Sequence, residues 1–453
     1  MPRASLKAWR WAFALAACTF LIYAPSLSGD FVMDDYRNIQ SNPWLASPAA
    51  WPSFFYDART THSLPLNASY RPLLTLSLAL SGELGGFNPF WFHLADVLGH
   101  CVNTALLFWL CLELSSSAPA AAAGAALFAL HPAQVESVAY IDGARPNVCS
   151  LLFCLAAFLV YRRGRRAGAA ALFACALLFK ETAVCFPLWL AVHDLASGPA
   201  PSPRELWRRW SPFAAVLAAY LAARRLVIGA TGQEDWAGLA AYVRRIAASL
   251  SVDARVLLAA PGSMTHCRSA FAPAWPVVAL VLLLAAGVVA AAIYSARRRR
   301  LEGLGLCFFL LALLPVSQLI PLYAFAADRF LYWPLAGLAV ALAGFLSRRG
   351  AARAVFAAAA LALWLLPGNI ERQLAWQDQF RLDVDSYAAA PDDPCTSLSL
   401  SFDYFNWGMP GRVTPLLRRA VSEAPPPELR AQARDVDRLL KDKMLRFRRK
   451  AKL

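Results

Sequence analysis

Apolar stretches long enough to cross a bilayer recur along most of this chain, and short clusters of arginine separate them. Residues 162–166, 297–300 and 348–349 are such clusters. About 20 apolar residues span a membrane as a helix, and short loops rich in Lys and Arg stay in the cytoplasm. Only 16% of the residues are charged, against about 25% in soluble domains. The pattern predicts an all-α polytopic membrane protein.

About eleven crossings place every short basic cluster on the cytoplasmic side. Basic residues precede the first apolar run, so the N-terminus is cytoplasmic. That run lacks a small-x-small cleavage pattern, which favours a retained helix over a signal peptide. The segment 167–198 fits one long helix or two short ones that meet at Lys180–Glu181, and two keep the next basic loop inside. The expected helices cover residues 9–27, 90–114, 118–138, 147–161, two within 167–198, 211–228, 273–295, 301–320, 330–347 and 352–367.

Two domains follow from this topology. Residues 1–367 form the transmembrane domain, and its first external loop, 28–88, is too polar and too rich in Pro, Trp and Asn to cross. We expect that loop to fold as short interfacial helices. Residues 368–453 form a small helical external domain that resembles one degenerate helical pair. Its last 25 residues are strongly basic, which suits a solvated tail or contact with anionic lipid headgroups.

The composition argues against a nucleic-acid-binding protein and against a zinc or disulfide framework. A formal net charge of +15 can indicate nucleic-acid binding, but here the arginines lie in short loops between apolar segments, so no nucleic-acid partner is expected. The ten cysteines show no CxxC pair and no zinc-ligand spacing. Most of them lie inside apolar runs and are expected to be buried, and their spacing supports no disulfide framework.

Adjacent carboxylates at Asp34 and Asp35 follow the first hydrophobic segment and lie on the external side. One of them can take a proton from an acceptor hydroxyl as a general base. The pair can instead help to bind a divalent cation, which prefers oxygen ligands. Both can also cap a surface helix, since Asp is a favoured N-cap residue. Spacing alone leaves these three uses open and leaves any metal unknown.

Three basic residues share the external side with this pair: Arg71, Lys180 and Arg329. Arginine binds phosphate in a bidentate manner and lysine acts as a point charge. Each of them alone could instead be a residue that snorkels to the membrane interface. Further polar residues lie on the same side and could pair with one another, namely Glu136, Asp142 and Arg145. Three cations on the side of the carboxylates predict a site for a phosphate-bearing substrate.

The order of these motifs resembles the membrane portion of the transmembrane-and-TPR protein O-mannosyltransferases and their bacterial relatives, which are GT-C glycosyltransferases. The resemblance covers roughly residues 20–335. It rests on Asp34-Asp35 with Asn38-Ile39, Tyr70-Arg71-Pro72-Leu73, Phe87-Asn88-Pro89, His93 with His100 and Asn103, His131-Pro132, Val135-Glu136-Ser137-Val138-Ala139-Tyr140, Lys180-Glu181 and Arg329-Phe330-Leu331-Tyr332.

The resemblance implies a GT-C-like bundle in a bacterial inner membrane, with its active site and C-terminal domain external, in the periplasm. It implies transfer of a mannose-like sugar from a polyprenyl phosphate, with inversion, to a protein Ser or Thr hydroxyl. Asp34 or Asp35 becomes the base, and Arg71, Lys180 and Arg329 become the donor-phosphate contacts. The resemblance gives supporting roles to Glu136, Tyr70, Arg145 and His131.

Three departures from the family pattern bear on these expectations. Asp96 stands where relatives often have Asn, and Arg145 is displaced by one residue from the usual pattern. The long TPR array is reduced to the degenerate pair in 369–445. A lipid or cell-surface glycan is therefore the alternative acceptor. A transporter or a non-catalytic scaffold are the alternatives from other classes, although a transporter would place its carboxylates at the midplane.

Overall fold

The structure, a computed structural model, is a bundle of helices. It describes residues 6–61, 69–196, 202–229, 238–259, 265, 266, 268, 271–320, 322, 324–422, 434 and 438. The predicted basic tail lies outside these residues. No strand occurs among them, so the expected all-α class is confirmed. The α-helices are α1 (Leu6–Tyr23), α2 (Pro72–Gly85), α3 (Pro89–Ser115), α4 (Ala118–Leu130), α5 (Glu136–Ala139), α6 (Ile141–Arg162), α7 (Arg166–Phe179), α8 (Phe186–Ala196), α9 (Pro203–Ile228), α10 (Leu239–Leu257), α11 (Trp275–Arg297), α12 (Leu301–Leu313), α13 (Tyr332–Ser347), α14 (Ala351–Ala375), α15 (Gln379–Ala389), α16 (Pro394–Asn406) and α17 (Pro410–Ser422).

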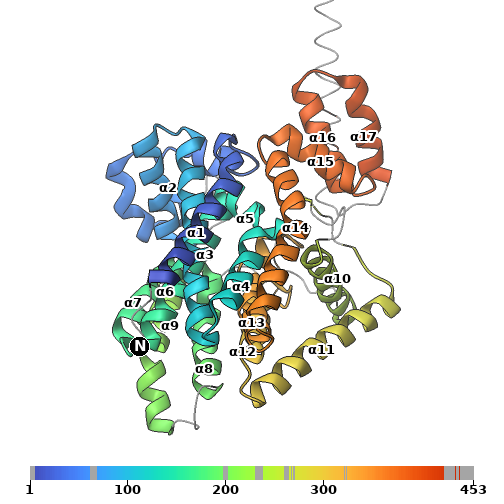
Figure 1. Ribbon diagram of the computed structural model, residues 1–453. Helices are drawn as coiled ribbons and strands as arrows, with labels where there is room; N and C mark the ends of the chain where they lie inside the picture. Colours follow the sequence, from blue (N-terminus) through green and yellow to red (C-terminus); the bar gives the residue numbers. More distant parts are fainter. Residues whose placement is uncertain are drawn as a thin grey trace, which may run out of the picture.

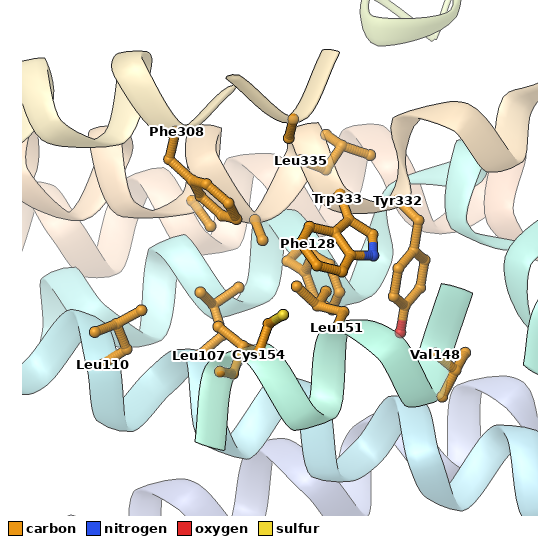
Figure 2. Packing of buried hydrophobic residues seen from close by; sticks show 14 of the residues in the cluster. Leu107, Leu110, Phe128, Val148, Leu151, Cys154, Phe308, Tyr332, Trp333 and Leu335 are labelled. Atoms are coloured by element: carbon orange, nitrogen blue, oxygen red, sulfur yellow. The ribbon is translucent and has the colours of Figure 1, made fainter. Parts of the chain in front are cut away.

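The centre of the bundle is an apolar core shared by α3, α4, α6, α12 and α13. Figure 2 shows Leu107, Phe128, Leu151 and Phe308 converging there from four of these helices. The Tyr332 hydroxyl, from α13, lies among them and bonds to His100 Nδ1 at 2.9 Å and Asn103 Nδ2 at 3.0 Å. Buried polar groups require such partners, and these bonds tie α3 to α13.

Glycines let α12 and α13 approach each other closely. A Cβ atom at Gly305 would lie 2.2 Å from the Ala341 backbone nitrogen, and one at Gly337 would lie 2.4 Å from that of Phe309. No side chain fits at such distances. Small residues at helix crossings are typical of membrane bundles, because they let backbones pack directly. This contact fixes α13 against α12, and α13 directly follows the short helical turn that carries Arg329.

Seven helices in the described part of the chain are long and apolar enough to cross a membrane, and three shorter apolar helices accompany them. The predicted membrane bundle is therefore confirmed, while the count of eleven crossings stays a prediction. The helix α11 stands apart from the bundle (Figure 1) and is only 11% buried within its apolar window. An apolar helix with so little protein around it faces lipid.

The structure departs from the predicted helix limits around residues 131–147. The third predicted helix ends at Leu130 rather than at 138, because His131 accepts the Ala133 N–H and Pro132 begins a short 3₁₀ helix. The next long helix begins at Ile141 rather than at 147. The stretch that sequence reasoning assigned to an external loop therefore contains the first turns of α6.

The last predicted membrane helix also continues further than expected, through Pro367 to Ala375. Its extension is held by the amides of Asn369 and Gln373. Asn369 donates to the Tyr23 hydroxyl and Gln373 to the Ile22 carbonyl, at 3.0 and 2.9 Å. The predicted domain boundary at 367/368 thus falls inside one continuous helix.

The first external loop and the C-terminal helices α15–α17 lie at the same end of the bundle, opposite the start of α1 (Figure 1). Within the loop, short helices over residues 24–28, 36–40, 48–55 and 58–60 precede α2, as expected for an interfacial segment. Helix α7 ends at Phe179, and a 3₁₀ helix begins at Glu181, so Lys180 lies between the two. Lys180–Glu181 is thus the junction of two helical segments, as the two-helix interpretation predicts.

Candidate active site

The two adjacent aspartates differ in their surroundings. Asp35 is completely buried, and its Oδ1 accepts the Asp142 backbone N–H at 2.8 Å while its Oδ2 accepts that of Val32 at 3.2 Å. It therefore holds the N-terminus of α6 against the first loop. Burial raises the pKa of Asp35 well above its ordinary value, and the Asp142 carboxylate adds to that rise.

Asp34 is the exposed member of the pair. Its Oδ2 accepts a hydrogen bond from the Tyr140 hydroxyl at 3.2 Å. Burial and the carboxylates of Asp142 and Asp34 raise the pKa of Tyr140, so the phenol stays protonated and acts as the donor. An exposed carboxylate can meet an incoming hydroxyl and take its proton, whereas the buried Asp35 has its oxygens committed to the backbone.

The three candidate phosphate contacts gather at the junction of α2, α7 and the short helix η9 (Asp328–Leu331). Arg71 forms a bidentate pair with Glu181, with N–O distances of 2.9 and 2.6 Å. Arg329 pairs with the buried Glu136 through both its guanidinium and its backbone N–H. The charges of both arginines act on Lys180. The structure therefore brings all three predicted cations together.

Lys180 is the least compensated of these cations. It is 7% exposed, and its Nζ donates to Asn147 Oδ1 at 2.5 Å. Burial lowers the pKa of Lys180 to about 7, and the neighbouring Arg71 and Arg329 contribute to the shift. Each of the two glutamates already pairs with an arginine, and the Asp142 carboxylate also acts on both arginines. A phosphate anion would supply the charge that Lys180 lacks.

Tyr140 connects these cations to the carboxylate. The Arg329 guanidinium carbon lies 5.6 Å from the centre of the Tyr140 ring, and the hydroxyl of the same ring bonds to Asp34. A cation that close to an aromatic face is attracted to it. Asp34 and Arg329 therefore both contact the Tyr140 side chain, so a carboxylate and a guanidinium lie on the same side of the bundle.

Three predicted supporting residues lie away from this cluster. Arg145 is buried and pairs with Asp96, and it also donates to the Ser81 hydroxyl and the Phe92 carbonyl. It joins α2, α3 and α6, and the unusual Asp96 of the sequence is its counter-ion. His131 bonds to the Leu257 carbonyl at 3.1 Å, and burial lowers its pKa to about 4.

Tyr70 is buried beside Tyr220, with ring centroids 6.0 Å apart. It borders Arg71 in sequence and braces the start of α2 against α9. Among the described residues, no group of three or more His, Cys, Asp or Glu side chains is arranged to hold a metal ion. The carboxylates of this site are instead engaged with backbone N–H groups, Tyr140 and arginines.

Sequence reasoning gave no role to Tyr140, Trp376 or Gln379. Tyr140 lies within a motif that the family resemblance used, and this was the only signal for it. Trp376 stacks on the Tyr140 ring at 5.7 Å, and the Gln379 side chain accepts the Met33 N–H. Both lie more than 230 residues from the group that they contact, so no local pattern could indicate them.

The chain matches known sequences over its central part. The sequence model of glycosyltransferase family 87 matches residues 70–317, more than half of the chain, including Arg71, Glu136 and Lys180. The helical bundle and this match define a membrane glycosyltransferase of the GT-C type. The chain belongs to glycosyltransferase family 87.

Individual curated relatives match only part of the chain. The chain is 35% identical over 218 residues to "Protein O-mannosyl-transferase TMTC1" of Mus musculus, and 34% identical over 196 residues to "Protein O-mannosyl-transferase TMTC2" of Homo sapiens. These alignments cover 43% and 40% of this chain and 23% of each relative. The chain therefore spans about a quarter of the length of the curated relatives that it matches.

One solved structure aligns over most of the chain. It is ArnT from Cupriavidus metallidurans bound to undecaprenyl phosphate, and the alignment covers 94% of this chain and 77% of the ArnT chain. The TM-score is 0.46 and the sequence identity is 13%.

Proposed function

We propose that this protein transfers a mannose-like sugar from a polyprenyl-phosphate donor to a protein Ser or Thr hydroxyl on the external face of a bacterial inner membrane. The observation that carries the proposal is the position of the exposed Asp34, next to Tyr140 and Arg329 and on the side of Arg71 and Lys180. The names of the relatives support the sugar and the acceptor.

In this mechanism the acceptor hydroxyl oxygen attacks the anomeric carbon of the sugar while Asp34 takes the hydroxyl proton. The bond between the anomeric carbon and the phosphate oxygen breaks, and polyprenyl phosphate leaves with the electron pair. Arg71, Lys180 and Arg329 stabilise the negative charge that develops on this phosphate, as fixed cations do in phosphate-transfer sites. A single displacement of this kind inverts the anomeric configuration.

The test is sugar transfer by the purified full chain from a mannosyl polyprenyl phosphate to a Ser/Thr-containing peptide, followed by mass spectrometry. Asp34→Asn should reduce transfer at least a hundredfold, because the base is lost. Asp57→Asn is the matched control, since Asp57 lies in the same loop and pairs with Arg59 at 2.6 Å. An active Asp34→Asn variant would refute the role of Asp34.

The acceptor is tested in the same assay with glycolipid and glycan acceptors in place of the peptide. Transfer to these alone would replace the protein acceptor by a lipid or surface glycan. No transfer to any acceptor by the unmodified chain would refute the proposed reaction.

A further inference from the structure

Residues that follow the last membrane helix contact the Asp34 loop directly. The Gln377 carbonyl accepts the Asp30 N–H at 2.8 Å, and the Gln379 side-chain oxygen accepts the Met33 N–H at 2.8 Å. One turn earlier, Gln373 Oε1 accepts a hydrogen bond from the Ser26 hydroxyl at 2.9 Å. The stretch between Ser26 and Asp34 is therefore attached to residues 373–379 along its length.

The attachment at Met33 acts on a strained part of the backbone. Met33 has φ of +51°, a left-handed conformation that is strained for a residue with a side chain. This residue directly precedes Asp34, so its conformation sets the direction in which the Asp34 side chain leaves the backbone. The Gln379 amide accepts the Met33 N–H in this conformation and so favours it over an extended one.

A second attachment acts on the Asp34 side chain through Tyr140. The Trp376 ring is 1% exposed and stacks on the Tyr140 ring, with centroids 5.7 Å apart and planes inclined by 23°. Stacked aromatic rings of this kind attract each other beyond the effect of burial alone. The stack holds the phenol at the place where its hydroxyl reaches Asp34 Oδ2.

We propose that the segment 373–379 is part of the active centre, and that Tyr140, Trp376 and Gln379 are positioning residues that orient Asp34. The proposal rests on the proposed function, since it takes Asp34 as the base of the glycosyl transfer. It also moves the functional boundary of the catalytic unit from residue 367 to the start of α15. The segment and the Asp34 loop both lie outside residues 70–317, over which the family's sequence model matches.

The first test compares Tyr140→Phe with Tyr56→Phe in the full chain. Tyr140→Phe keeps the ring and its stack and removes only the hydroxyl, whereas Tyr56 is a 69% exposed tyrosine in the first external loop, which contains Asp34. A hydrogen bond to a charged group is strong, so Tyr140→Phe should lower kcat about ten- to a hundredfold. KM for donor and acceptor should change less than twofold, and Tyr56→Phe should leave both constants unchanged.

The second test removes the attachment at Met33. Gln379→Ala removes this bond and also the bond that the Gln379 amide donates to Asp383 Oδ2 at 2.9 Å, and it should lower kcat about three- to tenfold, again with little change in KM. Val384→Ala is the control on the same helix, because Val384 is 39% exposed. Thermal unfolding of all four variants in detergent verifies that each is folded.

Distinct results separate this inference from the proposed function. If Asp34→Asn is inactive while Tyr140→Phe and Gln379→Ala both retain the full kcat, the positioning role is wrong and the proposed base stands. If these variants raise KM without lowering kcat, the segment serves substrate binding and the inference is likewise wrong. If the unmodified chain transfers no sugar, the proposed function itself fails.

Discussion

Asp35 provides the sharpest prediction, because the structure separates it from its neighbour Asp34. We expect Asp35→Ala to damage the fold and Asp34→Ala to damage only the reaction. Asp35 is fully buried and accepts two backbone N–H groups, those of Val32 and Asp142. Replacement by alanine leaves both donors buried without an acceptor and removes the cap of α6.

The magnitude follows from these contacts. A buried donor left without a partner costs about 1–3 kcal/mol, so two such donors cost about 2–6 kcal/mol. Removal of the buried carboxylate offsets part of this cost in stability, because burial and the adjacent Asp142 disfavour the charged form of Asp35. We expect a net loss of about 2–4 kcal/mol, of the size known for loss of a strong helix cap plus one buried bond. Asp34 is exposed, so water can replace it as the acceptor of the Tyr140 hydroxyl proton, and its replacement should change stability by less than about 0.5 kcal/mol.

Thermal unfolding of the detergent-solubilised full chain, followed by size-exclusion chromatography, measures this difference. Asp35→Ala should aggregate at a temperature several degrees lower than the unmodified chain, and Asp34→Ala should coincide with it. Sugar transfer, normalised to folded protein, should be lost in Asp34→Ala. Equal melting curves for the two variants would refute the assignment of Asp35 to the fold.

Three further predictions concern other parts of the chain. Asp96→Ala should destabilise the bundle by about 3–5 kcal/mol in the same unfolding assay, because it leaves the buried Arg145 charge without its counter-ion. The double variant Asp96→Leu with Arg145→Met should recover most of that stability, and a double variant as unstable as Asp96→Ala would refute this explanation. With the pKa of Lys180 lowered to about 7, the protonated fraction of Lys180 falls about tenfold between pH 6 and 8. The KM for the donor should therefore rise over this range, and Lys180→Arg should abolish the rise. An equal dependence of donor KM on pH in both proteins would exclude Lys180 as a phosphate contact. A membrane-impermeant thiol reagent should label Tyr56→Cys in intact cells and Arg299→Cys only after permeabilisation, and the reverse result would overturn the orientation.

The architecture was largely predictable because it follows from hydropathy and charge. Apolar runs separated by arginines define a membrane bundle, and the polar pair Lys180–Glu181 inside an apolar stretch indicated the helix break that the structure contains. The helix limits near His131 and Pro367 were not predictable in the same way. Long-range hydrogen bonds from Asn369 and Gln373 decide how far α14 continues.

The candidate site was predictable in part. The gathering of Arg71, Lys180 and Arg329 followed from topology and from the family resemblance. The division of roles between Asp34 and Asp35 did not, because adjacency in sequence does not tell which carboxylate turns inward.

Because α14 is one continuous helix from its apolar part to Ala375, we expect the thickness of the bilayer to affect the reaction. The apolar window of α14 is 11% buried within the protein, so most of that surface faces lipid, and a load on the helix is transmitted to the hydrogen bonds of Asn369 and Gln373 near its end. A change in hydrocarbon thickness shifts or tilts such a helix, and Trp376 and Gln379 shift with it relative to Tyr140 and Met33. Turnover should therefore follow acyl-chain length in reconstituted vesicles, with an optimum at the thickness that brings these residues into register with the Asp34 loop.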